Sequence, residues 1–502
     1  MADQERAHFG TEDPHAGRVP LPLHSSFKLI NRNYGKTLVR IGNQYFPRKT
    51  LILAFSESLL ILASLLAATV LRFHNFFDIQ EFLTDPYNWY RFIAVTLVCQ
   101  LALYYNDLYD LRATQSRGVL LIRSLRALGT ALLALAMLYY LFPHIRLERG
   151  IVALMAPLGL ALMLAWRIAM HSSKTFSRPL ERVLILGTGS SAAGLTREIL
   201  SRPELQYKIV GFLDENGEKI GKPLVSPGII GGISQLEEIV DRECIDRVVI
   251  SLSERRGVLP FRAMAALKLQ GLPIEDAQTV YERLTGRIMM DQLRPSSLIL
   301  ADGFGKSRLL LAGKRAIDLL VSSILIALTL PLMLGVAIAI LIESGRPVFF
   351  RQERIGLGGR TFQILKFRSM RQGSEKGRPR WTEDGDPRIT RLGGFIRKFR
   401  LDELPQLFNI LRGEMSLVGP RPEVPYFCEL LEKEIPFFNQ RHVVRPGLTG
   451  WAQVKYQYGA TLEESRTKFE FDLFYIKHLS LLLDLAIIFE TAKVVVWGRG
   501  AK

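Results

Sequence analysis

Two neighbouring carboxylates, Asp402 and Glu403, stand in the stretch "RLDELPQLFNILRG", directly after a basic run. Apolar residues in this stretch recur at the spacing of a short amphipathic helix that ends at Gly413, and Pro405 is tolerated only in the first turn of such a helix. The sequence therefore predicts both carboxylates at the helix N-terminus, where free backbone N–H groups favour anions. One interpretation is a plain helix cap, with Asp402 as the N-cap. The other is a pair of reactive groups that face in different directions.

Basic residues on glycine- and proline-rich turns surround this pair in the sequence. Arginines on short rigid turns suit fork-like binding of phosphate oxygens, although a solvated charged surface is the alternative for any one of them. A carboxylate can attack phosphorus, and a carboxylate pair can hold the Mg²⁺ that neutralises a diphosphate. The pattern therefore favours phosphoryl chemistry. The basic residues concerned are Arg351, Lys366, Arg368, Arg388, Arg391, Arg421 and Arg445.

The composition of the chain indicates a membrane protein with anionic partners. The 502 residues include 65 Lys+Arg against 48 Asp+Glu, and 48% of them are hydrophobic. The net charge of +17 is compatible with nucleic acid, phosphorylated molecules or anionic lipid. A soluble nucleic-acid binder needs no apolar runs of about 20 residues, so we expect no nucleic-acid partner. The three cysteines are far apart and predict neither disulfides nor a zinc site, and the polar N-terminus predicts no cleavable signal peptide.

Four early apolar segments predict a membrane region over residues 49–172, preceded by a polar and basic segment over residues 1–48. Loop charges alternate between basic and acidic along these helices, which predicts that both ends of the region lie in the cytoplasm. Residues 180–300 then alternate strands with helices and predict a parallel Rossmann-like α/β module. The apolar segments are about 51–71, 92–105, 127–142 and 151–170.

A fifth apolar run, over about 319–342, carries Pro331 near its middle and basic residues on both flanks. If this run spanned the membrane, the arginines that follow it would lie outside, against the positive-inside bias. A helix that breaks at Pro331 and returns to the same face avoids this conflict, so we predict a re-entrant helix, with a kinked spanning helix as the alternative. The last apolar stretch, "LSLLLDLAIIFE", predicts a surface-lying amphipathic helix because Asp484 interrupts it.

Residues 309–499 resemble the bacterial sugar transferases, the monotopic polyprenyl-phosphate phosphoglycosyl transferases. The four leading helices and the Rossmann-like module resemble the long, polytopic members, which start exopolysaccharide, capsule or O-antigen assembly. In the family the membrane helix is re-entrant and amphipathic helices lie at the interface. This chain departs from many members at the break, where Leu330 precedes Pro331 instead of a polar residue. The matching blocks are "KRAIDL", "FFRQERIG", "KFRSM", "DPRITRLGGFIRKFRLDELPQLFNILRGEMSLVGPRPE", "RPGLTGWAQV" and "DLFYIKHLSLLLD".

The resemblance implies an undecaprenyl-phosphate hexose 1-phosphate transferase of the glucose or galactose type. Such an enzyme takes a sugar 1-phosphate from a UDP-sugar, passes it to undecaprenyl phosphate and releases UMP. Asp402 would be the nucleophile, Glu403 its metal- or proton-handling partner, and both would hold Mg²⁺. Lys366, Arg388 and Arg421 match family positions near the phosphates. Further expected substrate-binding residues are Arg368, Arg445 and Gln453.

The resemblance also implies a location and partners. We expect a multi-pass protein of the bacterial inner membrane, with its catalytic domain on the cytoplasmic face against anionic lipid. A homodimer through the soluble module is a further expectation. The stretch "GTGSSA", residues 187–192, matches a dinucleotide fingerprint, but phosphosugar transfer needs no hydride carrier. We therefore favour a scaffold without a cofactor there, and a nucleotide as regulatory ligand stays open.

Two other function classes compete with the transferase. A membrane-bound nucleotide-sugar dehydratase or epimerase would need a second glycine fingerprint and a Tyr-x-x-x-Lys pair. The only such pair is Tyr45 and Lys49, ahead of the first membrane helix. A non-catalytic scaffold of polysaccharide assembly would use the basic surface only to bind lipid. It predicts that replacing Asp402 by Asn leaves function intact.

Overall fold

The structure is a computed structural model of the chain, and each of its modules is described separately below. The predicted N-terminal segment lies outside the described residues as far as residue 37. The residues that the structure describes are 38–41, 44–73, 75–110, 116–172, 181–202, 205–215, 221, 227–252, 259–290, 303–371, 386–456 and 461–496.

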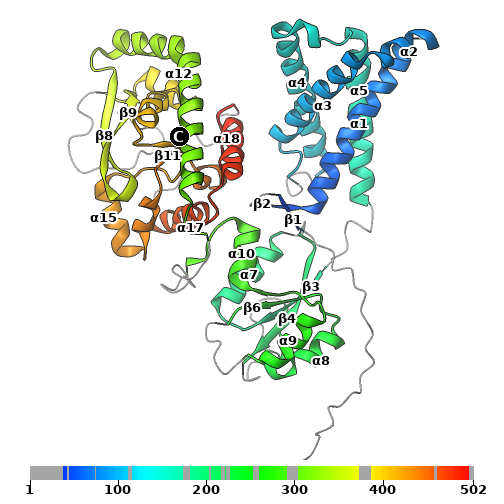
Figure 1. The fold of residues 1–502 in the computed structure, drawn as a ribbon, viewed down its shortest axis with the longest axis vertical. Helices are drawn as coiled ribbons and strands as arrows, with labels where there is room; N and C mark the ends of the chain where they lie inside the picture. Colours follow the sequence, from blue (N-terminus) through cyan, green and yellow to red (C-terminus); the bar gives the residue numbers. More distant parts are fainter. Residues whose placement is uncertain are drawn as a thin grey trace, which may run out of the picture. The chain divides into compact units, whose positions relative to one another are not determined.

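The membrane region forms a helical bundle whose four predicted helices are all present as α1, α3, α4 and α5 (Figure 1). Their facing sides share one apolar core. A buried ion pair of 2.6 Å between Glu57 and Arg167 joins α1 to α5 inside it. The sequence did not predict the hairpin and the short helix α2. The bounds are β1 Leu38–Ile41, β2 Gln44–Pro47, α1 Arg48–Arg72, α2 Phe76–Thr84, α3 Pro86–Tyr105, α4 Arg117–Leu141 and α5 Arg149–Ser172.

Four helices in the described part of the chain are long and apolar enough to cross a membrane, namely α1, α4, α5 and the later helix α12. By the same measures of length and composition α3 is not among them. Asn88 and Arg91 lie in its first turns and lower its apolar character. The predicted four-helix region is therefore confirmed as four helices, of which α3 is the least hydrophobic.

The Rossmann-like module is a five-stranded sheet with the strand order β5-β4-β3-β6-β7, and every pair of neighbours is parallel. Helices α7 and α10 pack on one face and α8 and α9 lie on the other (Figure 1). This confirms the predicted parallel α/β module. The bounds are β3 Glu181–Leu186, α7 Ser190–Leu200, β4 Tyr207–Asp214, β5 Ile229–Gly232, α8 Leu236–Arg242, β6 Arg247–Ile250, α9 Phe261–Leu269, β7 Ile274–Asp276 and α10 Ala277–Thr285.

The C-terminal region is mainly helical and carries two small two-stranded sheets, β8 with β9 and β10 with β11. Short 3₁₀ helices, η6 and η7, connect its elements. The bounds are α12 Arg308–Ser344, β8 Phe349–Ile355, β9 Thr361–Phe367, α13 Arg391–Lys398, η6 Leu401–Glu403, α14 Gln406–Arg412, β10 Ser416–Val418, α15 Pro425–Glu434, η7 Phe438–Val443, β11 Gly447–Thr449, α16 Trp451–Lys455, α17 Leu462–His478 and α18 Leu481–Val496.

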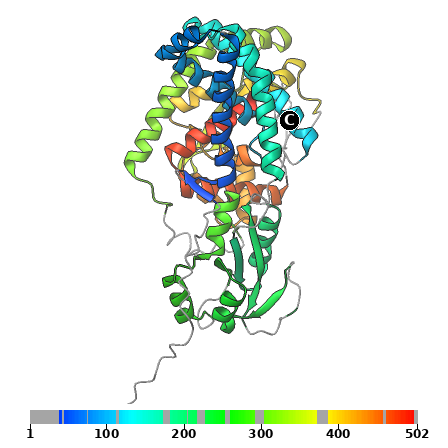
Figure 2. The ribbon, with the colours of Figure 1, turned by 90° about the vertical axis from the view of Figure 1, so that its right-hand side faces the viewer.

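Helix α12 holds Pro331 in its interior and changes direction sharply along its length (Figures 1 and 2). A proline inside a helix removes one backbone hydrogen bond and bends the axis, so the predicted break takes the form of a bend in one long helix. Most large apolar side chains of this helix are exposed, including Leu328 and Leu334. An apolar surface of this kind suits lipid contact.

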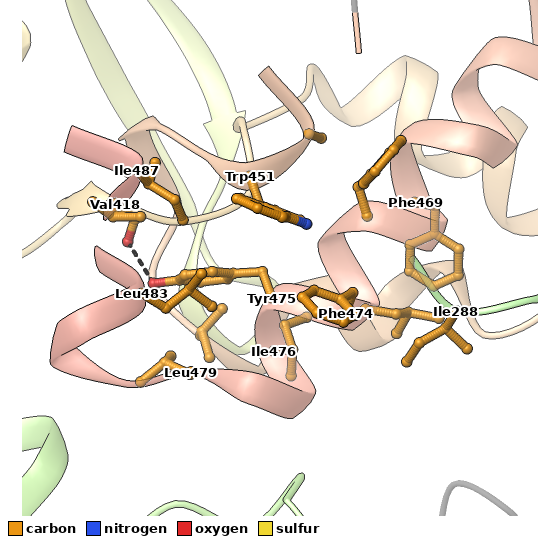
Figure 3. Packing of buried hydrophobic residues seen from close by; sticks show 14 of the residues in the cluster. Ile288, Val418, Trp451, Phe469, Phe474, Tyr475, Ile476, Leu479, Leu483 and Ile487 are labelled. Atoms are coloured by element: carbon orange, nitrogen blue, oxygen red, sulfur yellow. Dashed lines mark hydrogen bonds between the residues drawn. The ribbon is translucent and has the colours of Figure 1, made fainter. Parts of the chain in front are cut away.

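The core of the C-terminal region gathers side chains from α14 to α18. Figure 3 shows the part of this core around α16, α17 and α18. Trp451 stacks on Phe474 with 5.9 Å between the ring centroids. Tyr475 is fully buried, and its hydroxyl donates a hydrogen bond of 3.1 Å to the backbone oxygen of Val418. Because Val418 ends strand β10, this core fixes the strand from which the loop at 419–423 departs.

Candidate functional site

The carboxylate pair lies on the 3₁₀ turn η6, immediately before α14. Arg400 enters this turn with a positive φ of 57°, and Pro405 is the residue before the first residue of α14. Since Pro405 has no N–H, the hydrogen-bond ladder is interrupted there and the α-helix begins one residue later. The pair therefore lies one 3₁₀ turn before the α-helix, beside the N-terminus where the sequence predicts it, and Asp402 is not the N-cap of α14. The predicted end at Gly413 is confirmed, with φ of 86°.

Glu403 is held by three cations that all approach the same oxygen, Oε1. Lys366 Nζ on β9 donates to it at 3.2 Å, and Arg421 Nη2 donates to it at 3.0 Å. Arg400 Nη1 lies 3.8 Å from it. Glu403 is only 8% exposed, so these contacts form in a largely water-excluded place. Glu403 therefore ties together cations from three separate segments of the chain.

Asp402 is equally buried, at 8% exposure, yet it accepts no hydrogen bond from the part of the chain that the structure describes. Burial raises the pKa of Asp402, the neighbouring charge of Glu403 raises it further, and Lys366, Arg397 and Arg400 oppose the shift. A buried carboxylate without donors is poorly stabilised as an anion. Such a group is a better nucleophile than one whose lone pairs are occupied. No side-chain cap bond forms at either helix start, so the interpretation as a plain helix cap has no support.

The pKa values of the two carboxyl groups are shifted in opposite directions. Burial alone would raise the pKa of Glu403, but Lys366, Arg421 and Arg400 lower it well below its usual range. The three cations therefore favour the ionised form of Glu403. Groups in one site whose pKa values are pushed apart are typical of a division of roles. Here Glu403 serves as a fixed anion, and Asp402 is the group that can react.

A buried ion pair between Arg441 and Asp472 supports the backbone of Arg421. Arg441 Nη2 donates to the backbone oxygen of Arg421 at 2.9 Å and to Asp472 Oδ2 at 2.8 Å. Both partners of the pair are almost fully buried. Burial raises the pKa of Asp472 to about 6, while the Arg441 charge opposes the shift. The loop at 419–423 therefore has an internal support that depends on Asp472.

A second buried cluster supports strand β10 directly. Lys314 Nζ donates to the oxygen of Val418 at 2.9 Å and to Asp484 Oδ2 at 2.7 Å. The hydroxyl of Tyr475 lies 2.7 Å from Asp484 Oδ1. Burial raises the pKa of Asp484, and the charge of Lys314 opposes this shift. One cluster thus connects α12, α17 and α18 to the strand before Arg421.

The structure brings Lys366 and Arg421 to the carboxylate pair, whereas the other predicted substrate-binding residues bond elsewhere. Arg368 Nη2 donates to the backbone oxygens of Ser344 and Gly345 at the end of α12. Arg388 pairs with Asp386, Arg445 Nε donates to the oxygen of Gly413, and Gln453 Nε2 lies 3.5 Å from the oxygen of Leu448. Substrate contact by these four residues stays a prediction.

Sequence reasoning missed the roles of Arg400 and Arg441. Arg400 stands three residues before Glu403, a spacing that brings side chains together on a helical turn, so a local signal existed. Arg441 and Asp472 are 31 residues apart, and no local pattern could have paired them.

The carboxylate pair fits the Mg²⁺ that the resemblance implies. Asp402 has oxygens without hydrogen-bond donors from described residues, and Lys366, Arg400 and Arg421 all approach Oε1 of Glu403. The described residues hold no cluster of three or more His, Cys, Asp or Glu that could bind a metal alone. Mg²⁺ commonly binds through one or two carboxylates together with substrate phosphates and water, so two carboxylates are sufficient here.

Comparison with known proteins identifies the family. The model for "Bacterial sugar transferase" matches residues 309–498, and the model for "CoA-binding domain" matches residues 105–258. An uncharacterized sugar transferase of Haemophilus influenzae is 30% identical, over 74% of this chain and 79% of that protein. The chain belongs to the bacterial sugar transferase family. The carboxylate pair and its cations lie inside the matched transferase region of this sugar transferase.

Two further relatives have names that state an activity. A UDP-N-acetylgalactosamine-undecaprenyl-phosphate N-acetylgalactosaminephosphotransferase of Aeromonas hydrophila is 45% identical, over 48% of this chain and 56% of that protein. An undecaprenyl-phosphate glucose phosphotransferase of Komagataeibacter xylinus is 36% identical, over 66% of this chain and 62% of that protein. The sugar transferase thus spans between half and two thirds of the length of these two relatives.

Proposed function

We propose that this protein transfers a hexose 1-phosphate from a UDP-sugar to undecaprenyl phosphate and releases UMP. The observation that carries the proposal is the asymmetry of the carboxylate pair. Glu403 is held by three cations, and Asp402 beside it is buried without a donor. The names of the relatives describe this class of reaction with different sugars, which supports the class and leaves glucose, galactose and N-acetylgalactosamine as donors to test.

The chemistry divides into two displacements at phosphorus. An oxygen of Asp402 attacks the phosphorus that bears the sugar, the bond between that phosphorus and the bridging oxygen breaks, and UMP leaves. A phosphate oxygen of undecaprenyl phosphate then attacks the aspartyl phosphosugar, and the carboxylate of Asp402 is regenerated. Lys366 and Arg421, held in place by Glu403, stabilise the charge on the phosphate oxygens. Mg²⁺, when bound at the carboxylate pair, would neutralise part of the diphosphate charge.

The proposal also places the reaction at a membrane surface. Basic residues flank α12 on both sides, and a helix that bends and returns would keep them all at one face. We infer that this face is the cytoplasmic side of the bacterial inner membrane, where both substrates and anionic lipid meet. The product would be the first lipid-linked intermediate of an exopolysaccharide, capsule or O-antigen.

The dehydratase or epimerase alternative finds no support in the described residues. Their only sheet with more than two strands is the five-stranded one of the Rossmann-like module. A second nucleotide fold would need another parallel sheet of this kind. The scaffold alternative differs from the transferase in its prediction for Asp402 and is tested by the same experiment.

The test uses the full chain in lipid nanodiscs. Undecaprenyl phosphate is supplied together with UDP-glucose, UDP-galactose or UDP-N-acetylgalactosamine, with and without Mg²⁺, and UMP is measured. We expect UMP from at least one donor and a fall of at least about 10³-fold in the Asp402→Asn variant. No UMP with any donor would overturn the transferase function, and retained turnover in Asp402→Asn would favour the scaffold.

A trapping experiment separates the nucleophile from the overall reaction. With a donor labelled with ³²P in the phosphate next to the sugar and no lipid acceptor, the wild-type protein should acquire label and release one equivalent of UMP. The Glu403→Gln variant keeps Asp402 and should still acquire label, more slowly, whereas Asp402→Asn should acquire none. Label on Asp402→Asn would exclude this carboxylate as the attacking group.

A further inference from the structure

Asn409 of α14 is fully buried, at 0% exposure, and is not one of the groups of the proposed transfer site. Burying an amide is costly unless its N–H groups and its oxygen are hydrogen-bonded. The side chain of Asn409 makes three hydrogen bonds, two to the backbone of strand β9 and one to Glu414. These partners indicate what the residue does.

The two bonds to β9 have the pattern of a neighbouring strand. Asn409 Oδ1 accepts a hydrogen bond of 3.0 Å from the N–H of Leu365, and Asn409 Nδ2 donates one of 2.8 Å to the oxygen of Gln363. A C=O group and the N–H group two residues later point to the same side of a strand, where an adjacent strand would offer them one donor and one acceptor. The amide of Asn409 therefore replaces a strand residue.

These two backbone groups lie on the edge of β9 that β8 leaves unpaired. β9 pairs antiparallel with β8 from Thr361 to Phe367, and β8 is its only strand neighbour in the part of the chain that the structure describes. In an antiparallel pair, successive residues turn their N–H and C=O groups alternately toward the partner strand and away from it. Gln363 and Leu365 point away from β8, toward Asn409. Buried backbone groups need such a partner, and Leu365 is only 9% exposed.

The third bond fixes the amide in this orientation. Asn409 Nδ2 also donates to Glu414 Oε2 at 2.6 Å. Both N–H groups of the amide therefore have acceptors, and its oxygen has a donor. If the oxygen and the nitrogen exchanged places, the amide oxygen would face the oxygen of Gln363 and the carboxylate of Glu414. Because only one orientation satisfies all partners, Asn409 holds β9 in one register against α14.

This contact connects the two sides of the ion pair between Lys366 and Glu403. Lys366 directly follows Leu365 on β9, and its Nζ donates to Glu403 Oε1 at 3.2 Å. Glu403 lies on η6, which leads through Pro405 into α14, the helix of Asn409. The bonds of Asn409 thus hold the strand that carries the lysine against the helix that follows the glutamate.

We propose that Asn409 is a positioning residue of the phosphosugar transfer. By bonding to the edge of β9, it places Lys366 Nζ where the ammonium meets both Glu403 and the phosphate oxygens of the donor. Asn409 itself contacts no substrate. The proposal rests on the proposed function and adds to it a residue outside the set of charged groups. A purely structural Asn409 would stabilise the fold without affecting the rate at which a folded molecule reacts.

The test compares single-turnover rate constants of the full chain in nanodiscs. A limiting amount of a UDP-sugar that the wild-type protein uses is mixed with excess protein and undecaprenyl phosphate, and UMP release is followed. The forms compared are the wild type, Asn409→Ala, Lys366→Met and the double variant. With protein in excess, the rate constant describes the folded molecules and does not depend on what fraction of the protein is folded.

The expected result is a loss that depends on Lys366. We expect Lys366→Met to lower the rate constant about 10²-fold and Asn409→Ala to lower it about tenfold, since both weaken the stabilisation of charge in the transition state. In the double variant the lysine is absent, so Asn409→Ala should cause no further loss beyond about twofold. A residue that acts through Lys366 must show this non-additivity.

Ile410→Ala is the matched control. Ile410 follows Asn409 in α14 and is also fully buried, but its apolar side chain makes no hydrogen bond to the edge of β9. The variant should lower the unfolding temperature, because it leaves a cavity in the core. Its rate constant should stay within about twofold of the wild type, because a cavity lowers stability and leaves the bonds that position Lys366 intact.

Hydrogen–deuterium exchange tests the contact itself without any transfer reaction. In Asn409→Ala the amide of Leu365 loses its acceptor and should exchange faster. The amides of Ile364 and Lys366 face β8 and should keep their protection. Lys366→Met should leave the exchange at Leu365 unchanged.

Two results would overturn the proposal. One is a rate constant of Asn409→Ala that equals that of the wild type, or that falls by the same factor with and without Lys366. The other is unchanged exchange at Leu365 in Asn409→Ala. If the wild-type protein released no UMP with any donor, the proposed function would fail and the role in transfer with it. The exchange at Leu365 would still show whether Asn409 holds the edge of β9.

Discussion

At the scale of single residues, the burial of Asp402 lowers the free energy of unfolding when its carboxylate is ionised. Its pKa is raised in the folded protein, so the folded state holds the proton more tightly than the unfolded chain does. The stability that Asp402 contributes is fully present at pH values below its pKa in the unfolded chain. This contribution is lost as the pH rises through its pKa in the folded protein. At neutral pH the ionised group therefore opposes folding, a cost that its role in the proposed transfer would explain.

The first prediction follows from the direction of this pKa shift. At pH 7.5 Asp402→Asn should unfold at the same temperature as the wild type or at a higher one, while Glu403→Gln should be destabilised. Removing Glu403 leaves three partly buried cations without their anion, a loss on the order of 3 kcal/mol. Thermal unfolding in nanodiscs at one fixed scan rate compares the two neutral variants. A lower unfolding temperature for Asp402→Asn than for Glu403→Gln would contradict the assignment of roles.

The second prediction concerns the pH dependence of transfer. In the proposed transfer Asp402 attacks as an anion, so kcat/KM should fall as the pH drops through its pKa, above the ordinary value of 3.8. Glu403→Gln removes a negative neighbour that raises this pKa, so the acid limb should move to lower pH even though the plateau also falls. Glu429→Gln, the same change at an exposed position of α15, should leave the limb in place. A shift of the limb to higher pH would show that another group controls it.

The sequence could predict the residues of the site better than their contacts. Asp402, Glu403, Lys366 and Arg421 stood out because they match the sequence blocks of the bacterial sugar transferases, whereas the local pattern alone also allowed a helix cap and a solvated charged surface. Their convergence on Oε1 of Glu403 could not be predicted, because Lys366 and Arg421 belong to segments far apart in the chain. Which of several arginines reaches the pair depends on tertiary packing.

At the scale of elements, helix α12 contacts strand β10, which leads into the loop at 419–423. Asp318 of α12 accepts a hydrogen bond of 3.0 Å from the N–H of Leu417, and Lys314 one turn earlier binds Val418 and Asp484. A displacement of α12 would therefore act on the strand that leads to Arg421. Buried polar clusters of this kind fix one arrangement because each alternative leaves groups unpaired.

The third prediction tests this cluster by a double-mutant cycle. Lys314→Met alone leaves Asp484 buried without its cation and should destabilise the protein by about 3 kcal/mol, whereas Lys314→Met with Asp484→Leu should cost less than the sum of the single changes. Chemical unfolding in detergent measures stability, and UMP release measures transfer. Additive effects of the two substitutions would contradict a direct coupling between them.

Elements with a strong periodic pattern were predictable, and short or capped ones were not. Prediction and structure agree for the long apolar helices and for the strands around Val183, Ile209 and Val248. These elements are predictable because runs of apolar residues indicate buried segments. Strand β7 has three half-buried residues, and η6 is a single turn, so neither leaves a periodic signal. The sequence predicted Pro405 in the first turn of α14, whereas the helix begins one residue later, at Gln406. The reason is that Pro405 interrupts the backbone hydrogen bonds.

At the scale of the whole molecule, the bend of α12 decides on which side of the membrane the chain continues. The helix has 37 residues, about 55 Å if straight, which is longer than a bilayer core of about 30 Å. A straight spanning helix would place the residues after Ser344 on the opposite membrane face from those before Arg308. A bent helix that returns keeps Arg308 and the residues after Ser344 on one face.

The fourth prediction is therefore one of topology. In a protein with its three cysteines replaced, single cysteines are introduced at Gly305, before α12, at Arg360, after it, and at Gln80, in the first extramembrane segment. These exposed or open positions tolerate the change. A membrane-impermeant maleimide should label Gly305→Cys and Arg360→Cys in inside-out vesicles, and Gln80→Cys only in intact spheroplasts. In Pro331→Ala a straightened helix should reduce labelling of Arg360→Cys in inside-out vesicles and lower UMP release with it.

Labelling of Gly305→Cys and Arg360→Cys from opposite sides in the otherwise unchanged protein would contradict this topology. It would mean that α12 spans the membrane and that the proposed transfer site lies on the face opposite to Gly305.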